Sequence, residues 1–367
     1  MKYLFALGHP AHFHLFKNVI DELILKNNKV DIVISDKDVL KDLLNRYNMD
    51  YSIIAEKAIK NTKAEKIKRY LSSIFKLKEL IFNLKPDLLI GCLGQISYMT
   101  FLKKIPSLFF AEDDFRVTWM QGLLVYPFIE SIITPIVTET SVFSYKQTVY
   151  KGYHELAYLH PNRFKPNSDI VKKVISLGSP FFIIRFAKLT AYHDVGIKGI
   201  NTEIAQRIID TLKPYGNIWI TSERELEPQF EQYRININTL DIHHFLSFAN
   251  LYIGDSQTMA AEAGVLGTPF VRFNDFVGKL GYLNELENEY KLGYGFRTNQ
   301  TEEMMAKIKE LLLTHNLKQE WQKRRQKMLS DKIDVTAFMV WFVENYPDSA
   351  KMMKENPDCQ LRFRPAD

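Results

Sequence analysis

The sequence LYIGDSQTMAAEAGVLGTP at residues 251–269 decides the fold, because it reads as a strand, a tight turn and a helix built from small residues. Residues 251–253 are the apolar strand. Asp255 or Ser256 is a natural N-cap, and apolar residues then recur at helical spacing as far as Leu266. This pattern is typical of a strand-to-helix connection in an α/β domain.

A helix that begins at this turn offers a place for an anion. Its first turn has unpaired backbone N–H groups and the positive end of the helix dipole, which stabilise a phosphate without any lysine. Glu262 lies about one turn further along, within reach of a ribose hydroxyl pair on the same ligand. The alternative interpretation is an ordinary structural connection.

Composition sets the size and class of the protein. A chain of 367 residues with 46% hydrophobic content is long enough for two domains, each with its own core. Cys92 and Cys359 suggest neither a disulfide framework nor a zinc site, which fits a reducing compartment. The sequence shows no signal peptide and no apolar run of about 18 residues. We therefore expect a cytoplasmic protein that is soluble or peripheral to the inner face of the cell membrane.

The distribution of charge is more informative than its total. A net charge of +5, from 48 Lys and Arg against 43 Asp and Glu, is too small to indicate nucleic-acid binding. Residues 56–85, however, contain nine basic and three acidic residues among apolar ones. They predict a basic amphipathic helix able to rest on anionic lipid. The alternative is a surface helix whose apolar face packs on its own sheet.

Apolar, β-rich runs alternate with helical patterns in the first half of the chain. The expected strands are residues 3–7, 30–34, 88–92, 107–110 and 131–134, and the expected helices include residues 15–26 and 38–47. Such alternation predicts a parallel sheet that is covered by helices on both faces.

A second series of the same kind follows a segment rich in Pro and Asn at residues 159–167. Its expected strands are residues 181–186, 217–221, 234–237, 251–253 and 269–273, with helices such as residues 202–212. The predicted fold class is therefore α/β, with two doubly wound Rossmann-like domains facing a cleft. We expect the domains at residues 1–160 and 161–335. Residues 336–367 are expected to be a helix returning to the first domain and a loosely ordered tail.

Three of the nine histidines fall within residues 9–14, directly after the first strand. His9, His12 and His14 lie where a helix begins, so their imidazoles are placed to act as general bases near neutral pH. A purely structural cluster is the alternative. We expect no metal, because no Asp, Glu or Cys cluster follows at a recognisable spacing.

Further polar residues follow the expected strands of the second domain. Arg185 near a strand end can brace a phosphate through its guanidinium fork. Ser222, Glu223 and Arg224 follow the next strand and are expected on the cleft wall, with a solvated helix cap as the alternative. Two further candidates are the base-pocket residue His243 and the titratable pair His193 and Asp194.

Several common motifs are missing from the sequence. It contains neither the nucleophile elbow GxSxG nor the phosphate loop GxxxxGK[ST], and no GxGxxG follows the first strand. These absences argue against an α/β hydrolase, a P-loop enzyme and an ordinary NAD dehydrogenase.

Four segments together carry a resemblance. GHPAHFH (8–14), YKGYHELAYL (150–159), SEREL (222–226) and GDSQTM (254–259) resemble a poorly characterised bacterial and archaeal family. That family was formerly a domain of unknown function, and it is often encoded with surface-polysaccharide genes. It is similar to GT-B fold glycosyltransferases, including the peptidoglycan N-acetylglucosaminyltransferase, and to the non-hydrolysing UDP-N-acetylglucosamine 2-epimerase. The resemblance implies a GT-B-like fold over nearly the whole chain.

The resemblance also implies roles for the segment that begins at Asp255. Ser256, Gln257 and Thr258 would hold a diphosphate, and Glu262 would bind the ribose. Gln257 and Thr258 replace the paired glycines of the epimerase, so the backbone approaches the phosphates through a more crowded space. The epimerase segment Gly-Thr-Arg-Pro-Glu after the first strand is also missing.

The expected function is a metal-independent glycosyltransferase without a cofactor. It would move a sugar from a nucleotide diphosphate donor, expected to be a UDP-sugar, to a glycan or lipid-linked acceptor in surface polysaccharide synthesis. The second domain would hold the donor, and His12 or His14 would deprotonate or orient the acceptor. Residues 56–85 and the apolar loop 119–126 would help with a membrane-anchored acceptor. The alternatives are a UDP-N-acetylglucosamine 2-epimerase-like enzyme and a nonenzymatic nucleotide-sugar-binding protein.

Overall fold

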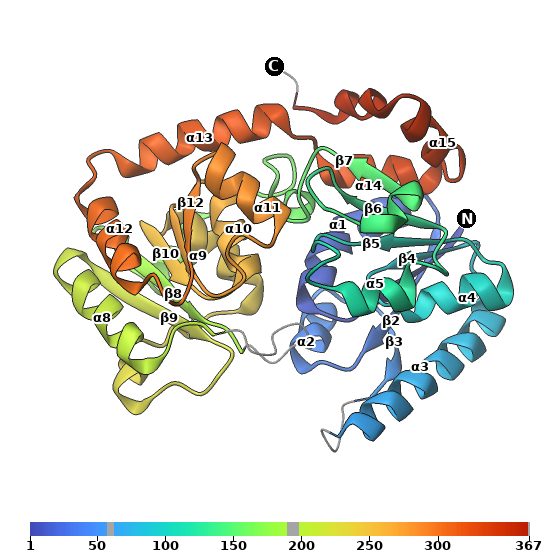
Figure 1. Ribbon diagram of the computed structural model, residues 1–367, viewed down its shortest axis with the longest axis horizontal. Helices are drawn as coiled ribbons and strands as arrows, with labels where there is room; N and C mark the ends of the chain where they lie inside the picture. Colours follow the sequence, from blue (N-terminus) through green and yellow to red (C-terminus); the bar gives the residue numbers. More distant parts are fainter. Residues whose placement is uncertain (57–61, 189–197, 366–367) are drawn as a thin grey trace. The chain divides into compact units, whose positions relative to one another are not determined.

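A computed structural model describes residues 1–56, 62–188 and 198–365 of the chain. The chain forms two compact units, shown in Figure 1. Unit 1 comprises Met1–Tyr158 and Ile333–Asp367, and unit 2 comprises Leu159–Lys332. The sequence had placed the corresponding boundaries at residues 160 and 335.

Unit 1 is built on a seven-stranded sheet with the order β3-β2-β1-β4-β5-β6-β7, in which every neighbouring pair is parallel. The strands are β1 (Lys2–Leu7), β2 (Lys29–Ser35), β3 (Ser52–Ala55), β4 (Leu88–Gly91), β5 (Ser107–Phe110), β6 (Ser131–Pro135) and β7 (Gln147–Tyr150). The chain proceeds from β1 toward one edge and from β4 toward the other. The order of the strands therefore reverses between β1 and β4, which makes their carboxyl ends the expected position for a ligand.

Helices cover both faces of this sheet. They are α1 (Pro10–Leu25), α2 (Asp38–Arg46), α3 (Lys63–Leu84), α4 (Gln95–Lys103), α5 (Trp119–Val125), α14 (Val335–Glu344) and α15 (Asp348–Glu355), and α6 (Leu156–Leu159) follows β7. Leu4 and Ala6 of β1 face a core shared with α3, α4 and α5. Phe5 points to the opposite face, where its ring centroid lies 5.3 Å from that of Phe16 in α1, and α1 packs against α14.

Unit 2 contains a five-stranded parallel sheet with the order β12-β11-β10-β8-β9. Its strands are β8 (Phe181–Phe186), β9 (Asn217–Ser222), β10 (Leu251–Gly254), β11 (Phe270–Phe273) and β12 (Gly293–Phe296). Its helices are α7 (Ser168–Lys172), α8 (Thr202–Leu212), α9 (Ile242–Phe248), α10 (Gln257–Leu266), α11 (Gly281–Asn284), α12 (Thr301–Leu313) and α13 (Leu317–Asp331). The chain proceeds from β8 toward one edge and from β10 toward the other, so the order of the strands reverses between β8 and β10. Two doubly wound parallel sheets confirm the predicted fold class.

Four local expectations are corrected. Residues 234–237 form no strand, because the 3₁₀ helix Pro228–Tyr233 brings the chain back to the edge strand β9 at a single bridge between Ile220 and Arg234. Residues 119–126 are mainly the helix α5 rather than a loop. The first helix begins at Pro10 instead of residue 15, because the side chain of His9 caps it. The fourth correction concerns the C-terminal tail.

The tail is ordered rather than loose. It forms α15 and a 3₁₀ helix over Pro357–Phe363. The buried Gln360 side chain accepts a 2.7 Å hydrogen bond from the backbone N–H of Lys151, and the N–H of Asp334 donates to the carbonyl of Phe363 at 2.8 Å. These contacts attach the tail to β7 and to the start of α14.

Candidate functional site

The start of α10 lies at the switch point of the unit 2 sheet. Ser256 is its N-cap, and the Ser256 hydroxyl accepts a hydrogen bond from the Met259 N–H at 3.4 Å. Helix α10 begins at Gln257, and Ser256, Gln257 and Thr258 are all half-buried. Because β8 and β10 are neighbours whose connections leave in opposite directions, this helix start occupies the position where doubly wound sheets bind ligands.

Asp255 has a different role from the one expected of a simple N-cap. Its carboxylate is buried and accepts hydrogen bonds from the N–H of Ala187 at 2.6 Å and from that of Ile200 at 3.2 Å. A Cβ atom on Gly199 would lie 2.6 Å from the Asp255 carboxylate, so only glycine fits there. Burial raises the pKa of Asp255 to about 6, although the two backbone hydrogen bonds act in the opposite direction. Asp255 thus fastens the backbone that follows β8 to the end of β10.

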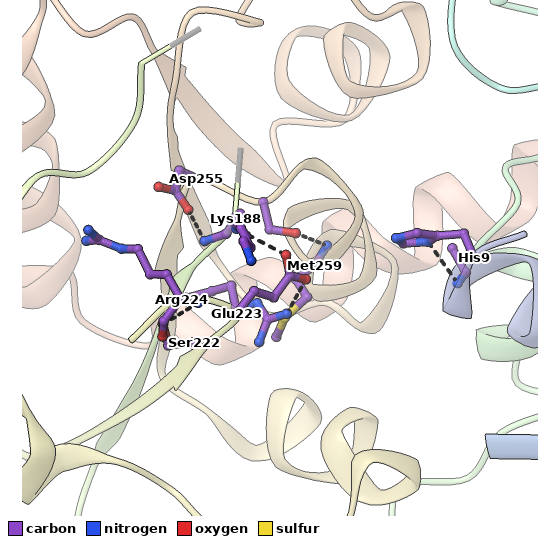
Figure 2. A network of polar contacts seen from close by, with 11 residues as sticks. His9, Lys188, Ser222, Glu223, Arg224, Asp255 and Met259 are labelled. Carbon is purple, nitrogen blue, oxygen red and sulfur yellow. Dashed lines mark hydrogen bonds and ion pairs between the residues drawn. The ribbon is translucent and has the colours of Figure 1, made fainter. Parts of the chain in front are cut away.

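The polar residues predicted at the ends of β8 and β9 form one network (Figure 2). The Arg185 guanidinium pairs with the Glu223 carboxylate at 2.5 Å, and Glu223 also accepts from the Lys188 N–H at 3.1 Å. The Ser222 hydroxyl donates to the Arg224 carbonyl at 2.6 Å. Arg224 in turn donates to the Ile200 carbonyl at 3.1 Å. The structure therefore brings the four predicted residues 185 and 222–224 together with Asp255.

A cavity of about 600 Å³ lies beside this network. It is lined by Ala187, Lys188, Lys198, Gly199, Ile200, Asn201, Ile204, Arg224, Asp255 and Thr298. Its volume is in the range of small-molecule sites. Lys188, Lys198 and Arg224 give the lining a positive character that suits an anionic ligand. The predicted pair His193 and Asp194 lies outside the described residues.

His243 and Glu262 form a buried pair between α9 and α10. The His243 Nε2 atom lies 2.9 Å from the Glu262 carboxylate, and the two residues are only 3% and 4% exposed. Neither lines the cavity. The structure thus places the residues predicted for the base pocket and the ribose in contact with each other, one helix turn behind the start of α10.

In unit 1, two of the three clustered histidines are anchored by backbone amides. The Nδ1 atom of the exposed His9 accepts from the Ala11 N–H at 3.2 Å, and that of His12 accepts from the Gly8 N–H at 3.0 Å. Burial, followed by the charges of His9, His154 and Lys37, lowers the pKa of His12 well below its usual value. The neutral His12 ring therefore carries its proton on Nε2. This geometry favours hydrogen-bond donation over the base role expected from the sequence.

His14, the third histidine, lies among aromatic rings. It is buried, and its ring centroid lies 5.2 Å from that of Tyr158 and 5.3 Å from that of Phe13.

The structure adds two titratable residues that the sequence did not single out. Glu112 follows β5 and His154 follows β7, so both lie at the carboxyl edge of the unit 1 sheet. The Glu112 carboxyl accepts from the His154 N–H at 2.7 Å and lies 3.6 Å from His154 Nδ1. Burial and then the nearby Glu155 raise the pKa of Glu112 well above its usual value. Burial lowers the pKa of His154 to about 3.

At neutral pH these two shifts favour a protonated Glu112 carboxyl and an uncharged His154 imidazole. The signal that could have found them is positional, since each lies within four residues of the carboxyl end of a strand. His154 also lies within the segment 150–159 that carries the family resemblance.

No metal-binding cluster was found in the part of the chain that the structure describes, where no three His, Cys, Asp or Glu side chains come close enough to hold an ion.

The fold of two doubly wound sheets is shared with solved structures of UDP-N-acetylglucosamine 2-epimerases and of glycosyltransferases. UDP-N-acetylglucosamine 2-epimerase from Rickettsia bellii is similar over 96% of this chain and 98% of its own, with a TM-score of 0.65 and 18% identity. The S. aureus MnaA–UDP structure covers 95% of this chain and 97% of its own, with a TM-score of 0.67 and 14% identity. The spinosyn rhamnosyltransferase SpnG, complexed with spinosyn aglycone, is similar over 94% of this chain and 100% of its own. The TM-score is 0.63 and the identity is 13%.

The chain belongs to the family described as protein of unknown function (DUF354), which matches residues 2–347. This confirms the resemblance found in the sequence. No curated protein matches the chain.

Proposed function

We propose that the protein is a metal-independent glycosyltransferase of the GT-B type, acting in surface polysaccharide synthesis. It would transfer a sugar from a nucleotide diphosphate donor, preferably a UDP-sugar, to a hydroxyl of a glycan or lipid-linked acceptor. The observation that carries the proposal is the start of α10, which lies at the β8/β10 switch point of unit 2.

The start of α10 is suited to a departing diphosphate. Its backbone N–H groups and helix dipole stabilise negative charge, and Arg224, Lys188 and Lys198 line the neighbouring cavity. These groups offer the charge stabilisation that a metal ion supplies in other transferases. The similar S. aureus structure holds UDP and the similar rhamnosyltransferase structure holds spinosyn aglycone, which supports the assignment.

Unit 1 would supply the groups that handle the acceptor proton. His12 would orient the acceptor hydroxyl through its Nε2–H, and Glu112 with His154 would exchange the proton. All three lie on the segments that follow β1, β5 and β7, at one edge of the same sheet. His9 is exposed at the same edge and is a further candidate.

The second candidate is a nucleotide-sugar 2-epimerase. The pair of Glu112 and His154 favours it, because epimerisation needs acid and base groups around the sugar and these two are held near their neutral forms. The similar R. bellii structure is itself an epimerase.

The two functions are separated by incubating the protein in D₂O and EDTA with UDP-sugars and GDP-sugars, with and without glycan and lipid-linked acceptors. A CMP-sugar, which lacks a diphosphate, is the control. We expect nucleoside diphosphate release only when acceptor is present. Sugar interconversion without acceptor, with deuterium entering the sugar ring, would favour the epimerase. A protein that binds the donor but changes no sugar under any condition would refute both.

A further inference from the structure

Exposed apolar side chains gather on three consecutive helices of unit 1. On α3, Leu71, Phe75 and Phe82 are 51%, 68% and 71% exposed. Their spacing of four and seven residues places them on one side of the helix. Phe101 at the end of α4 is 70% exposed, and Trp119 and Leu123 of α5 are about half exposed. These six residues are called the apolar surface below.

The three helices that carry the apolar surface are neighbours, since α3 packs against α4 and α4 packs against α5 (Figure 1). The rings of Tyr70 in α3 and Tyr98 in α4 are in edge contact, with centroids 6.2 Å apart. The Tyr98 hydroxyl donates to the Leu124 carbonyl of α5 at 3.1 Å. Phe128, just after α5, contacts the rings of both Tyr98 and Phe101. Six exposed apolar residues on neighbouring helices indicate an interaction site rather than scattered exposure.

Positive charge accompanies the apolar surface. Lys68 lies three residues before Leu71, and Lys78 lies between Phe75 and Phe82 on the same side of α3. The exposed Glu79 lies near this side as well, so the lysines outnumber the acidic residue there. Lys103 and Lys104 follow Phe101 directly, and all four lysines are exposed. Neither α4 nor α5 contains an acidic residue. The occupant of this surface should therefore be apolar and negatively charged.

An anionic lipid bilayer meets both requirements better than a second copy of the chain. In a two-fold contact between copies, the lysines of one copy would face those of the other, which is unfavourable. A bilayer instead accepts Phe and Leu below its headgroups, holds Trp119 at their level and attracts lysines to its phosphates. Within the described ranges, no helix is long and apolar enough to cross a membrane.

We propose that unit 1 docks on an anionic membrane surface through α3, α4 and α5. The proposal deepens the proposed function, because it places the acceptor at the membrane and so selects a lipid-linked class. Vesicle binding requires no sugar transfer, however, so either proposal can fail while the other holds.

The test is co-sedimentation of the full chain with vesicles of phosphatidylcholine alone or mixed with phosphatidylglycerol. We expect binding to the mixed vesicles that weakens with salt, and at least about tenfold weaker binding to phosphatidylcholine. We expect affinity for the mixed vesicles to fall about tenfold or more in each of two double variants, Phe75→Ser/Phe101→Ser and Lys68→Glu/Lys78→Glu. Because these side chains are exposed, the unfolding midpoint should change little, with the lost contact between Phe101 and Phe128 as the largest effect.

The matched control is Leu313→Ser/Lys323→Glu on unit 2, where both residues are also exposed. It should bind vesicles as the wild type does. Equal binding by the wild type and the two unit 1 variants would overturn the proposal, as would an equal loss in the control. Light scattering that shows a dimer dissociated by Phe75→Ser/Phe101→Ser, without vesicle binding, would identify a second copy as the occupant. Transfer to a water-soluble acceptor should be unaffected by the unit 1 variants.

Discussion

The imidazole of His12 shows how one backbone contact sets the chemistry of a side chain. Its Nδ1 atom is occupied by the Gly8 N–H, so the neutral ring presents an N–H at Nε2. A glutamine side chain can place an amide N–H near the same point, whereas alanine cannot. We therefore expect His12→Gln to retain clearly more kcat than His12→Ala, by about tenfold. Steady-state kinetics checks this. Equal losses in the two variants, with a basic limb in the pH profile, would indicate a general base.

Glu262 is a second residue whose role the structure redefines. Removing its carboxylate leaves His243 buried without its partner at 2.9 Å, so Glu262→Ala should cost about 3 kcal/mol or more of unfolding free energy. Glu262→Gln keeps a hydrogen-bonding group and should cost less than half as much. Urea unfolding measures both, and titration with UDP measures the ribose role separately. If Glu262→Gln binds UDP as tightly as the wild type does, the carboxylate does not hold the ribose.

His154 should make unit 1 sensitive to acid. Burial lowers its pKa from 6.5 to about 3, so between these values the unfolded chain binds a proton that the folded chain does not. Stability should therefore fall as the pH drops from about 6.5, by about 1.4 kcal/mol per pH unit from this group. Urea midpoints at pH 5 and pH 7 should differ less in His154→Asn than in the wild type. The control His315→Gln changes an exposed histidine, and an equally reduced difference there would argue against His154.

Among the elements, the short strands at sheet edges were the hardest to predict. β3, β7 and β12 have four residues each and were not predicted, and each lies at the edge of its sheet. An edge strand is only partly covered and so lacks the continuous apolar run that marks a central parallel strand. The runs at residues 3–7 and 181–186 are central in their sheets and were predicted for that reason.

The helices of the C-terminal tail were also not predicted from the sequence. Its polar composition resembles a disordered segment, yet the side chain of Gln360 makes a specific bond to β7. Gln360→Ala would leave the Lys151 N–H without this partner and should cost about 1–3 kcal/mol of unfolding free energy. Thermal unfolding checks this against Glu355→Ala, a change at an exposed position of α15. If the tail contributes nothing to stability, the two variants will have the same thermal unfolding midpoint.

At the scale of the whole molecule, the strand and helix of the proposed anion site were predictable because they are contiguous in the sequence. A strand, a turn and a small-residue helix fall within residues 251–266, so local rules suffice. The pair of Glu112 and His154 is different, since 42 residues separate them and only the sheet order brings them together. From the sequence alone, a lone Glu after a strand is expected at the surface, whereas the Glu112 side chain is only 12% exposed. The histidine cluster was predictable as a group, but the tautomer of His12 depends on one backbone amide.

The central claim is that the start of α10 binds a diphosphate, and Gln257→Glu tests it most directly. A carboxylate in the first turn favours the helix by about 0.3–1 kcal/mol, so the variant should be as stable as the wild type or more so. The same charge would repel a diphosphate. Calorimetric titration should show that the wild type binds UDP more tightly than uridine, and that Gln257→Glu loses about tenfold or more in UDP affinity while uridine affinity is unchanged. Gln229→Glu, an equal charge on an exposed residue of unit 2, should bind UDP as the wild type does. Undiminished UDP affinity in a folded Gln257→Glu protein would contradict the claim.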